Sequence, residues 1–340
     1  MSHEWLLTST PAPARAVIVP SSFPSDVLVP TSAPGGTHHH STERFIAVKK
    51  FAAALAVVPL VIGLAGCGST NSSSSSSSSK KVTIGVVGSE KFNKTLKEEA
   101  KKQGIDIEYK EFSAYTEPNP ALDAGDIDMN RFQHIAYLSN YNVSANKDLQ
   151  IVGPTVIYPM ALFSKKHSKL ADIPQGGEIV IPNDTVNEAR ALKLLKTNGL
   201  VTFKNADVDA PTIDDVDTSA SKVKVTPVDA TQTVVGMESA DGAVVNNDFL
   251  KDAGLKPADA LAQDDPKSDP SAIKYVNLFV AQKDKADDET YKKIVEIFHT
   301  KPVMDAVQEE TRGTAVEVNV STDELRQSLA KEEAKLRAKK

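Results

Sequence analysis

The sequence has very little cysteine and no surplus of positive charge. Cys67 is its single cysteine, so neither an internal disulfide nor a cysteine-based zinc site can form. Its 39 Lys and Arg residues stand against 45 Asp and Glu, whereas a groove for nucleic-acid phosphates needs a basic surplus. A Gly-x-Ser-x-Gly elbow, a phosphate-binding glycine loop and a zinc signature are also missing. We therefore expect no nucleic-acid partner, no enzymatic activity, no metal and no cofactor.

A signal peptide is predicted in the first fifth of the chain. Two lysines precede an apolar run, residues 51–66, which is too short to span a bilayer comfortably and ends in small residues. The ending Leu64-Ala65-Gly66-Cys67 resembles the bacterial lipobox, whose cysteine receives a lipid before cleavage makes it the N-terminus. A buried free cysteine at the end of an apolar helix would not explain this order of features. We expect a signal peptide over 48–66 and a lipid on Cys67 that holds the protein at the extracytoplasmic face of the cell membrane.

The segments that flank the signal peptide have no periodicity typical of a fold. Residues 1–47 are rich in Pro, Ser, Thr and Ala, so we expect a disordered leader or a mis-annotated start. A GTG start codon at Val48 would turn the beginning into Met-Lys-Lys-Phe-Ala, and the leader would then need no function. The serines at 72–79 predict a flexible tether, so that residues 67–80 link the lipid to the folded part.

Strand and helix signals alternate along the rest of the chain. The first set begins with an apolar run closed by a glycine, and its elements lie at 81–88, 90–103, 105–109, 119–124 and 126–129. A second set has strands near 178–181, 222–226 and 242–245 and a helix over 186–197. This βαβ order predicts parallel sheets with crossover helices, and therefore two α/β lobes. A strand over 275–281 and an amphipathic helix over 288–299 follow.

The chain ends in a charged segment, residues 321–340. It begins with a capping-box pattern, Ser321-Thr322-Asp323-Glu324, which predicts a helix. Few of its positions are apolar, and helices of mixed charge are usually only solvated. We expect an exposed helix beyond the fold, with a role in docking a transporter as the alternative.

A candidate anion site lies where a predicted strand ends and a helix begins. Three residues of Pro182-Asn183-Asp184-Thr185 are competent N-caps, and the free N–H groups of a helix start favour an anion. Asn187 and Arg190 share one face of this helix, and arginine can bind a carboxylate with two hydrogen bonds. The pattern predicts a carboxylate clamp. The alternative is that Arg190 is a surface charge stabilised by Glu188 or by water.

Nine short segments between residues 82 and 318 share their order and spacing with a known family. They are Phe112-Ser-Ala-Tyr115, Pro118-Asn119, Gly125-Asp-Ile-Asp128, Phe132-Gln-His134, Tyr158-Pro159, Ser164-Lys-Lys166, Pro182-Asn-Asp184, Asn187 with Arg190, and Tyr275-Val-Asn-Leu278. Together with the lipobox, these segments resemble the NlpA/MetQ family of methionine-binding lipoproteins. The resemblance implies an extracytoplasmic receptor that captures L-methionine and delivers it to the permease and ATPase of an ABC importer.

The family resemblance also implies the architecture. It is the two-lobe, type II periplasmic-binding-protein fold, in which each lobe is a mainly parallel sheet flanked by helices and two crossing segments form a hinge. We expect residues 81–157 and 276–320 to form the first lobe, residues 158–275 to form the second, and the receptor to be a monomer.

Four residues of the first set are expected to line one edge of the ligand site. Tyr115, Phe132, His134 and Tyr137 fall on a loop, a strand end and the helix that follows. Aromatic rings suit a thioether, because each good sulfur–aromatic contact contributes about 0.3–1.5 kcal/mol. Ordinary core packing is the alternative for Phe132. A metal ligand is the alternative for His134, although no second ligand lies at helical spacing from it.

The polar part of the expected site comes from the second lobe and the hinge. Asn187 and Arg190 would hold the carboxylate of the ligand. The resemblance assigns Asn246 to the ligand's amino group and places Asn277 near the crossing strand, and amide oxygens can accept hydrogen bonds from an ammonium. Asn247 departs from the family pattern, which more often has a small hydroxyl residue there.

Other interpretations of the sequence stay open. The acidic stretch 258–271 is longer than the resemblance suggests, and we expect it to be a solvated loop. The alternatives to L-methionine capture are a receptor for D-methionine, a receptor for a methionine-containing dipeptide, and a surface adhesin or antigen with a vestigial pocket.

Overall fold

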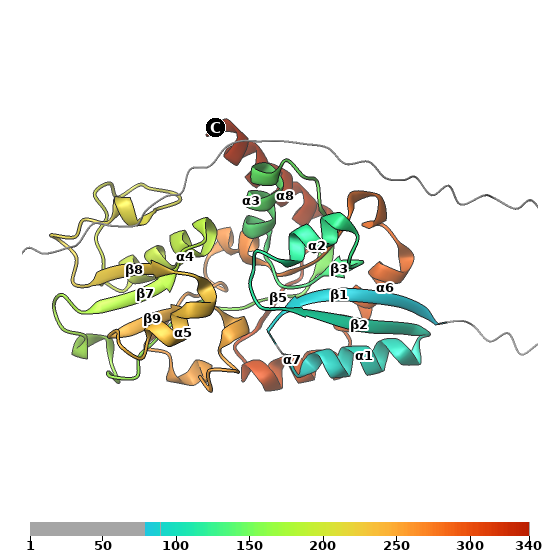
Figure 1. Ribbon diagram of the computed structural model, residues 1–340, viewed down its shortest axis with the longest axis horizontal. Coiled ribbons are helices and arrows are strands. Elements are labelled where there is room, and N and C mark those ends of the chain that lie inside the picture. The colour runs from blue at the N-terminus through green and yellow to red at the C-terminus, as the bar shows by residue number, and fades with distance from the viewer. Residues whose placement is uncertain (1–78, 89, 340) are drawn as a thin grey trace, which may run out of the picture. The chain divides into compact units, whose positions relative to one another are not determined.

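A computed structural model describes residues 79–88 and 90–339 (Figure 1). The leader 1–47, the signal peptide 48–66, the lipid on Cys67 and nearly all of the tether therefore lie outside the described residues. Within the described part, no helix combines the length and the apolar character needed to cross a bilayer.

The first lobe is built on a five-stranded mixed sheet. In sheet order its strands are β2 (Ile105–Phe112), β1 (Lys80–Val87), β3 (Met129–Asn130), β11 (Leu278–Ala281) and β4 (Gln150–Pro154). The central β1 pairs in parallel with β2 and β3, as the βαβ order predicts. The strand β11 returns from the second lobe and pairs antiparallel with both β3 and β4. The sheet is mixed because this returning strand alone runs opposite to the other four.

Helices cover both faces of this sheet. One face packs on α1 (Phe92–Lys102), α6 (Glu289–Phe298) and α7 (Lys301–Thr311), and the other on α2 (Pro118–Ala124) and α3 (Ile135–Ala145). The side chains of β1 alternate, so that Val82, Ile84 and Val86 enter the core with α1. The result is a three-layer arrangement (Figure 1).

The second lobe repeats this plan with a second five-stranded sheet. Its strands, in order, are β10 (Ala262–Gln263), β6 (Ala161–Phe163), β9 (Gly242–Val245), β7 (Glu178–Pro182) and β8 (Lys224–Val228). The strand β7 pairs in parallel with β8 and β9, and β6 pairs antiparallel with its two neighbours, β9 and the edge strand β10. The helices α4 (Thr185–Thr197) and α5 (Thr233–Gly236) pack on it. The predicted two-lobe α/β fold is confirmed.

The chain crosses between the two sheets twice. It leaves the first between β4 and β6 and returns between β10 and β11. The two crossing segments are hydrogen-bonded to each other, because Thr155 N donates to Asn277 O over 2.8 Å and Asn277 N donates to Val156 O over 3.0 Å. Beside them, β5 (Val156–Ile157) pairs with β12 (Val316–Glu317). The crossing is therefore a narrow ribbon of a few residues, the kind of segment that serves as a hinge.

Most predicted elements lie within two residues of the observed ones, and the differences have local causes. The last strand begins at Leu278 rather than 275, because Pro270–Tyr275 forms a 3-10 turn. The third strand is only Met129–Asn130, since residues 126–128 form bends. The sequence pattern did not predict α7, whose proline lies in its first turn, where proline is tolerated.

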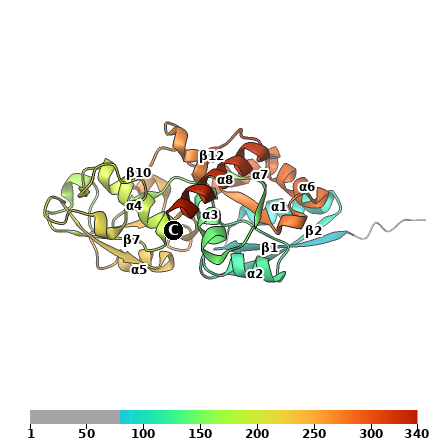
Figure 2. The ribbon, with the colours of Figure 1, turned by 90° about the horizontal axis from the view of Figure 1, so that it is seen from above.

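The C-terminal helix α8 (Thr322–Ala338) is where the expectation was wrong. Its capping box is present, because Ser321 Oγ accepts from Glu324 N over 3.2 Å. The helix is not beyond the fold, however. Leu325 and Leu329, four residues apart on one face, are 0% and 2% exposed, and Arg326 Nε donates to Ile151 O of β4 over 2.9 Å. Through these two leucines α8 packs in the core beside α3 (Figure 2).

Candidate functional site

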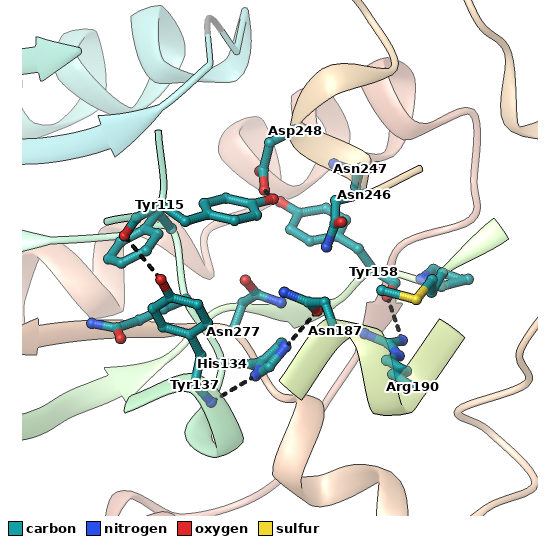
Figure 3. Close-up of a pocket in the computed structure, with 14 residues that line it drawn as sticks. Tyr115, His134, Tyr137, Tyr158, Asn187, Arg190, Asn246, Asn247, Asp248 and Asn277 are labelled. Atoms are coloured by element: carbon teal, nitrogen blue, oxygen red, sulfur yellow. Dashed lines mark hydrogen bonds between the residues drawn. The ribbon is translucent and has the colours of Figure 1, made fainter. Parts of the chain in front are cut away.

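One cavity lies between the lobes, and all eight candidate site residues line it (Figure 3). About 420 Å³ of space that no atom fills lies among these side chains, open solvent included. The full lining is Tyr115, Phe132, Gln133, His134, Tyr137, Tyr158, Pro159, Met160, Asn187, Arg190, Asn246, Asn247, Asp248 and Asn277. Both lobes and both crossing segments contribute, so the cavity exists only when the lobes are together.

Three rings of the first lobe form an aromatic wall. Tyr115 follows β2, Phe132 follows β3, and Tyr137 lies in the first turn of α3. Their ring centroids are 5.7–6.0 Å apart in tilted and edge-on pairs, a favourable range for aromatic contacts. The Tyr137 hydroxyl donates to Tyr115 O over 3.1 Å. Phe132 is 7% exposed, so it packs in the core and also lines the cavity.

A buried amide network holds the backbone behind this wall. Asn119, Asn130 and Gln133 exchange four side-chain hydrogen bonds of 2.6–2.9 Å. Gln133 stands between Phe132 and His134, and its carbonyl accepts from Leu278 N of the returning strand over 3.0 Å. A fully satisfied polar network of this kind rigidifies the segment that carries two of the lining residues.

His134 connects the first lobe to the second. It is the N-cap of α3, and its Nδ1 accepts from Tyr137 N over 3.2 Å. Burial, together with the charge of Arg190, lowers the pKa of His134 to about 3, so the imidazole is neutral. Because Nδ1 accepts, Nε2 carries the proton and donates to Asn187 Oδ1 over 3.3 Å. The neutral ring therefore forms a hydrogen bond across the cavity.

The start of α4 differs from the prediction of a free anion site. Asp184 is the N-cap and accepts from Asn187 N over 3.0 Å, while both of its oxygens accept from Asn187 Nδ2. The chain's own carboxylate thus occupies the helix start, where burial raises the pKa of Asp184. The amide of Asn187 is fixed between Asp184 and His134.

Arg190 is a buried cation rather than a surface charge. Its side chain is 6% exposed, and its guanidinium carbon lies 4.2 Å from the ring centre of Tyr275. Its Nε donates to Asp264 Oδ2 over 2.6 Å, and its Nη2 donates to Tyr158 O over 3.0 Å. Asp264 follows β10 in the acidic stretch 258–271, so the expectation that this stretch is only a solvated loop was wrong. The rest of the stretch contains exposed turns.

Two asparagines offer amide groups to the cavity. Asn246 follows β9, and its Oδ1 is buried without a hydrogen-bond partner among residues 79–88 and 90–339. An acceptor in this state is available to a ligand donor. Asn277 lies on the second crossing segment, where its backbone holds the two crossings together. Asn247 also lines the cavity, at the start of the 3-10 turn Asn247–Phe249.

Asp248 is one of six lining residues that the predicted site did not include. The Tyr115 hydroxyl donates to Asp248 Oδ2, which forms a second contact between the lobes (Figure 3). Burial, with the negative charge of Glu90 as the next cause, raises the pKa of Asp248 to about 7. Glu90 itself is buried in an ion pair with Arg131. A turn that begins Asn-Asn-Asp is an ordinary surface pattern, so the sequence held no signal for this burial.

The sequence and the structure of this chain are both similar to those of known proteins. Residues 81–319 match the family model of NlpA lipoproteins. The D-methionine-binding lipoprotein MetQ of Escherichia coli is 34% identical over 272 residues, which cover 79% of this chain and 97% of that protein. A substrate-binding protein of a methionine transporter from Streptococcus pneumoniae is similar in structure, with a TM-score of 0.65 and 33% identity over 70% of this chain and 96% of that one. A nutrient-binding protein from Burkholderia cenocepacia bound to methionine has a TM-score of 0.64 and 31% identity over 69% and 98%.

Proposed function

This chain belongs to the NlpA lipoprotein family, and on that premise we propose that it is the substrate-binding lipoprotein of a methionine ABC importer. One observation carries the proposal. A cavity between two lobes has a buried arginine on one side and three aromatic rings on the other. An amino acid with a long apolar side chain has matching groups at its two ends.

Each part of the ligand has a partner of suitable chemistry. The carboxylate would lie on Arg190 beside Asn187, because a buried guanidinium is a strong carboxylate ligand. The ammonium would meet the unpaired amide oxygen of Asn246 and the amide of Asn277. The thioether would lie among the rings of the aromatic wall, where sulfur–aromatic contacts are favourable.

Capture would work by closure of the lobes. Arg190 and Asn246 belong to the second lobe and the aromatic wall to the first, so a bound amino acid contacts both. These contacts exist only in the closed arrangement, and a ligand favours the state for which its affinity is higher. The closed form would then be what the permease recognises, while a lipid on Cys67 keeps the receptor near the membrane.

Calorimetric titration of the purified chain with L-methionine tests the proposal. We expect saturable binding, and at 100 times its Kd the ligand should add about 2.7 kcal/mol of stability in a thermal-shift assay. The same assay with all other amino acids and with methionine-containing dipeptides defines the specificity. If no amino acid or dipeptide binds, the importer function fails and a surface adhesin becomes the better description.

The D-enantiomer is the second candidate, because relatives such as the Escherichia coli protein are described as D-methionine-binding. Both enantiomers carry the same three groups, and they differ in how these groups can reach Arg190, Asn246 and the rings together. Paired titrations with L- and D-methionine decide which one the cavity prefers.

A further inference from the structure

The guanidinium of Arg190 is fixed on three sides by the protein itself. Asp264 Oδ2 accepts from Nε, Tyr158 O accepts from Nη2, and Tyr275 lies under the plane of the group. An arginine has five N–H donors in a rigid fork, so these two bonds leave three donors, two on Nη1 and one on Nη2. No partner for Nη1 is present among residues 79–88 and 90–339. The cation therefore keeps one edge for a ligand.

Asp264 is itself held in place by the sheet of the second lobe. Its Oδ1 accepts from Met160 N over 2.8 Å, and its own N donates to Met160 O over 3.0 Å. It directly follows β10, which pairs antiparallel with β6. Its side chain is 25% exposed, whereas that of Arg190 is 6% exposed. The carboxylate is thus a fixed point next to Arg190, and it is not itself part of the cavity lining.

We propose that Asp264 is a positioning residue for the ligand carboxylate. By accepting from Nε–H, Asp264 prevents Nε from binding the ligand. The two donors of Nη1 and the second donor of Nη2 are then left for the carboxylate, which an arginine can bind through two parallel N–H bonds. The role rests on the proposed function, because it needs a ligand with a carboxylate on Arg190. Asp264 lies within the acidic stretch 258–271 and reaches the ligand only through Arg190.

The opposite role for Asp264 is also physically reasonable, and it has a different signature. A carboxylate next to Arg190 could compete with the ligand for the cation, and its removal would then strengthen binding. Under the positioning role, loss of the acceptor weakens binding. Asp264→Asn separates the two roles, because the amide keeps an oxygen for Nε but removes the negative charge.

The test is a set of methionine titrations on the full chain. We expect Asp264→Ala to raise the Kd about tenfold, and Asp264→Asn to stay within about threefold of the wild type. In an Arg190→Ala background, Asp264→Ala should have no further effect, since its action passes through the arginine. Asp265→Ala, at the exposed neighbouring aspartate, is the matched control and should bind like the wild type.

The outcomes separate this inference from the proposed function. If Asp264→Ala binds methionine as well as the wild type or better, or if its loss persists in the Arg190→Ala background, the positioning role is overturned. An L-methioninol titration adds a second readout, because a ligand without a carboxylate should be indifferent to Asp264→Ala. If methionine does not bind the wild type at all, the proposed function fails first. If Arg190→Ala binds methionine normally, the carboxylate lies on another group, and the positioning role is overturned while the proposed function stands.

Discussion

The two walls of the cavity differ in what they offer and in how they are held. The first-lobe wall consists of three rings and a neutral histidine, and ring contacts hold it together. The second-lobe wall presents a cation and amides, and an acid of the same lobe fixes two of these groups: Asp184 fixes Asn187 and Asp264 fixes Arg190. The polar wall thus contacts groups that every amino acid has, while the aromatic wall contacts the side chain. Affinity and selectivity are therefore separable, and the following changes test that division.

Arg190→Ala should have the largest effect. Removal of one partner of a buried charge pair costs about 2–5 kcal/mol, and calorimetry with L-methionine measures it directly. Because the polar wall contacts the carboxylate, every amino acid that the chain binds should lose a similar amount. Arg326→Ala, at a partly buried arginine on α8, is the control and should keep its affinity. An unchanged affinity in Arg190→Ala would place the carboxylate on another group.

The second change concerns the protonation of Asp248, whose hydrogen bond with Tyr115 is one of two that join the walls. In the closed arrangement the pKa of Asp248 is raised to about 7, whereas the ordinary value is 3.8. Between these pH values closure takes up a proton, so methionine affinity should fall as the pH rises, with log Kd increasing by up to about 1 per pH unit. Titrations from about pH 5 to pH 8 measure the slope.

Asp248→Asn is the matched variant for this pH dependence. The groups that face Asp248 are Tyr115, Glu90 and Arg131, and Glu90 is a second buried carboxylate. A flat profile in Asp248→Asn would assign the proton to Asp248. An unchanged slope in this variant would assign the proton to another group.

Asp184→Ala should lower both the stability of the chain and its affinity for methionine, by an intermediate amount, because Asp184 holds part of the polar wall in place. Loss of an N-cap aspartate costs about 0.5–2 kcal/mol of stability, which urea unfolding measures. Asp184 also fixes the amide of Asn187, so methionine affinity should fall as well. Asp288→Ala removes the N-cap of α6 in the other lobe and is the control for stability. If both variants lose stability but neither loses affinity, the fixed polar wall does not matter for binding.

Tyr137→Leu should have the smallest effect and the most selective one. A sulfur–aromatic contact contributes about 0.3–1.5 kcal/mol, so methionine should weaken by that amount. Norleucine has a methylene in place of the sulfur and should weaken less in the same variant. Competition titrations with the two ligands give the difference. Equal losses would show that the ring provides only apolar area.

The fold could be predicted because its signals are local. The glycine that stops the first helix, Gly104, has φ +78°, which is why a glycine is needed there. The eight candidate site residues do meet in one cavity, since the segments that carry them lie at the ends of strands and the starts of helices. Their roles toward a ligand remain proposals.

The residues that could not be predicted owe their environment to distant parts of the chain. Asp248 and Asp264 sit in turn-rich, acidic sequence that is usually exposed, and their surroundings come from Tyr115 and Arg190, more than 70 residues away. The same holds for α8, whose two buried leucines become visible only once α3 and β4 are in place. Charge and hydropathy patterns report on a local segment and contain no information about such partners.

The returning strand β11 also sets an order of assembly. It lies between β3 and β4 in the interior of the first sheet, although 123 residues separate Pro154 from Leu278. The strands of the second sheet all lie within that interval. During synthesis the second lobe is therefore complete while the first still lacks a central strand, and domains generally fold as units in the order of synthesis. The lobe that begins first is the one that finishes last, so a translational pause near residue 275 would leave a folded second lobe attached to an open sheet.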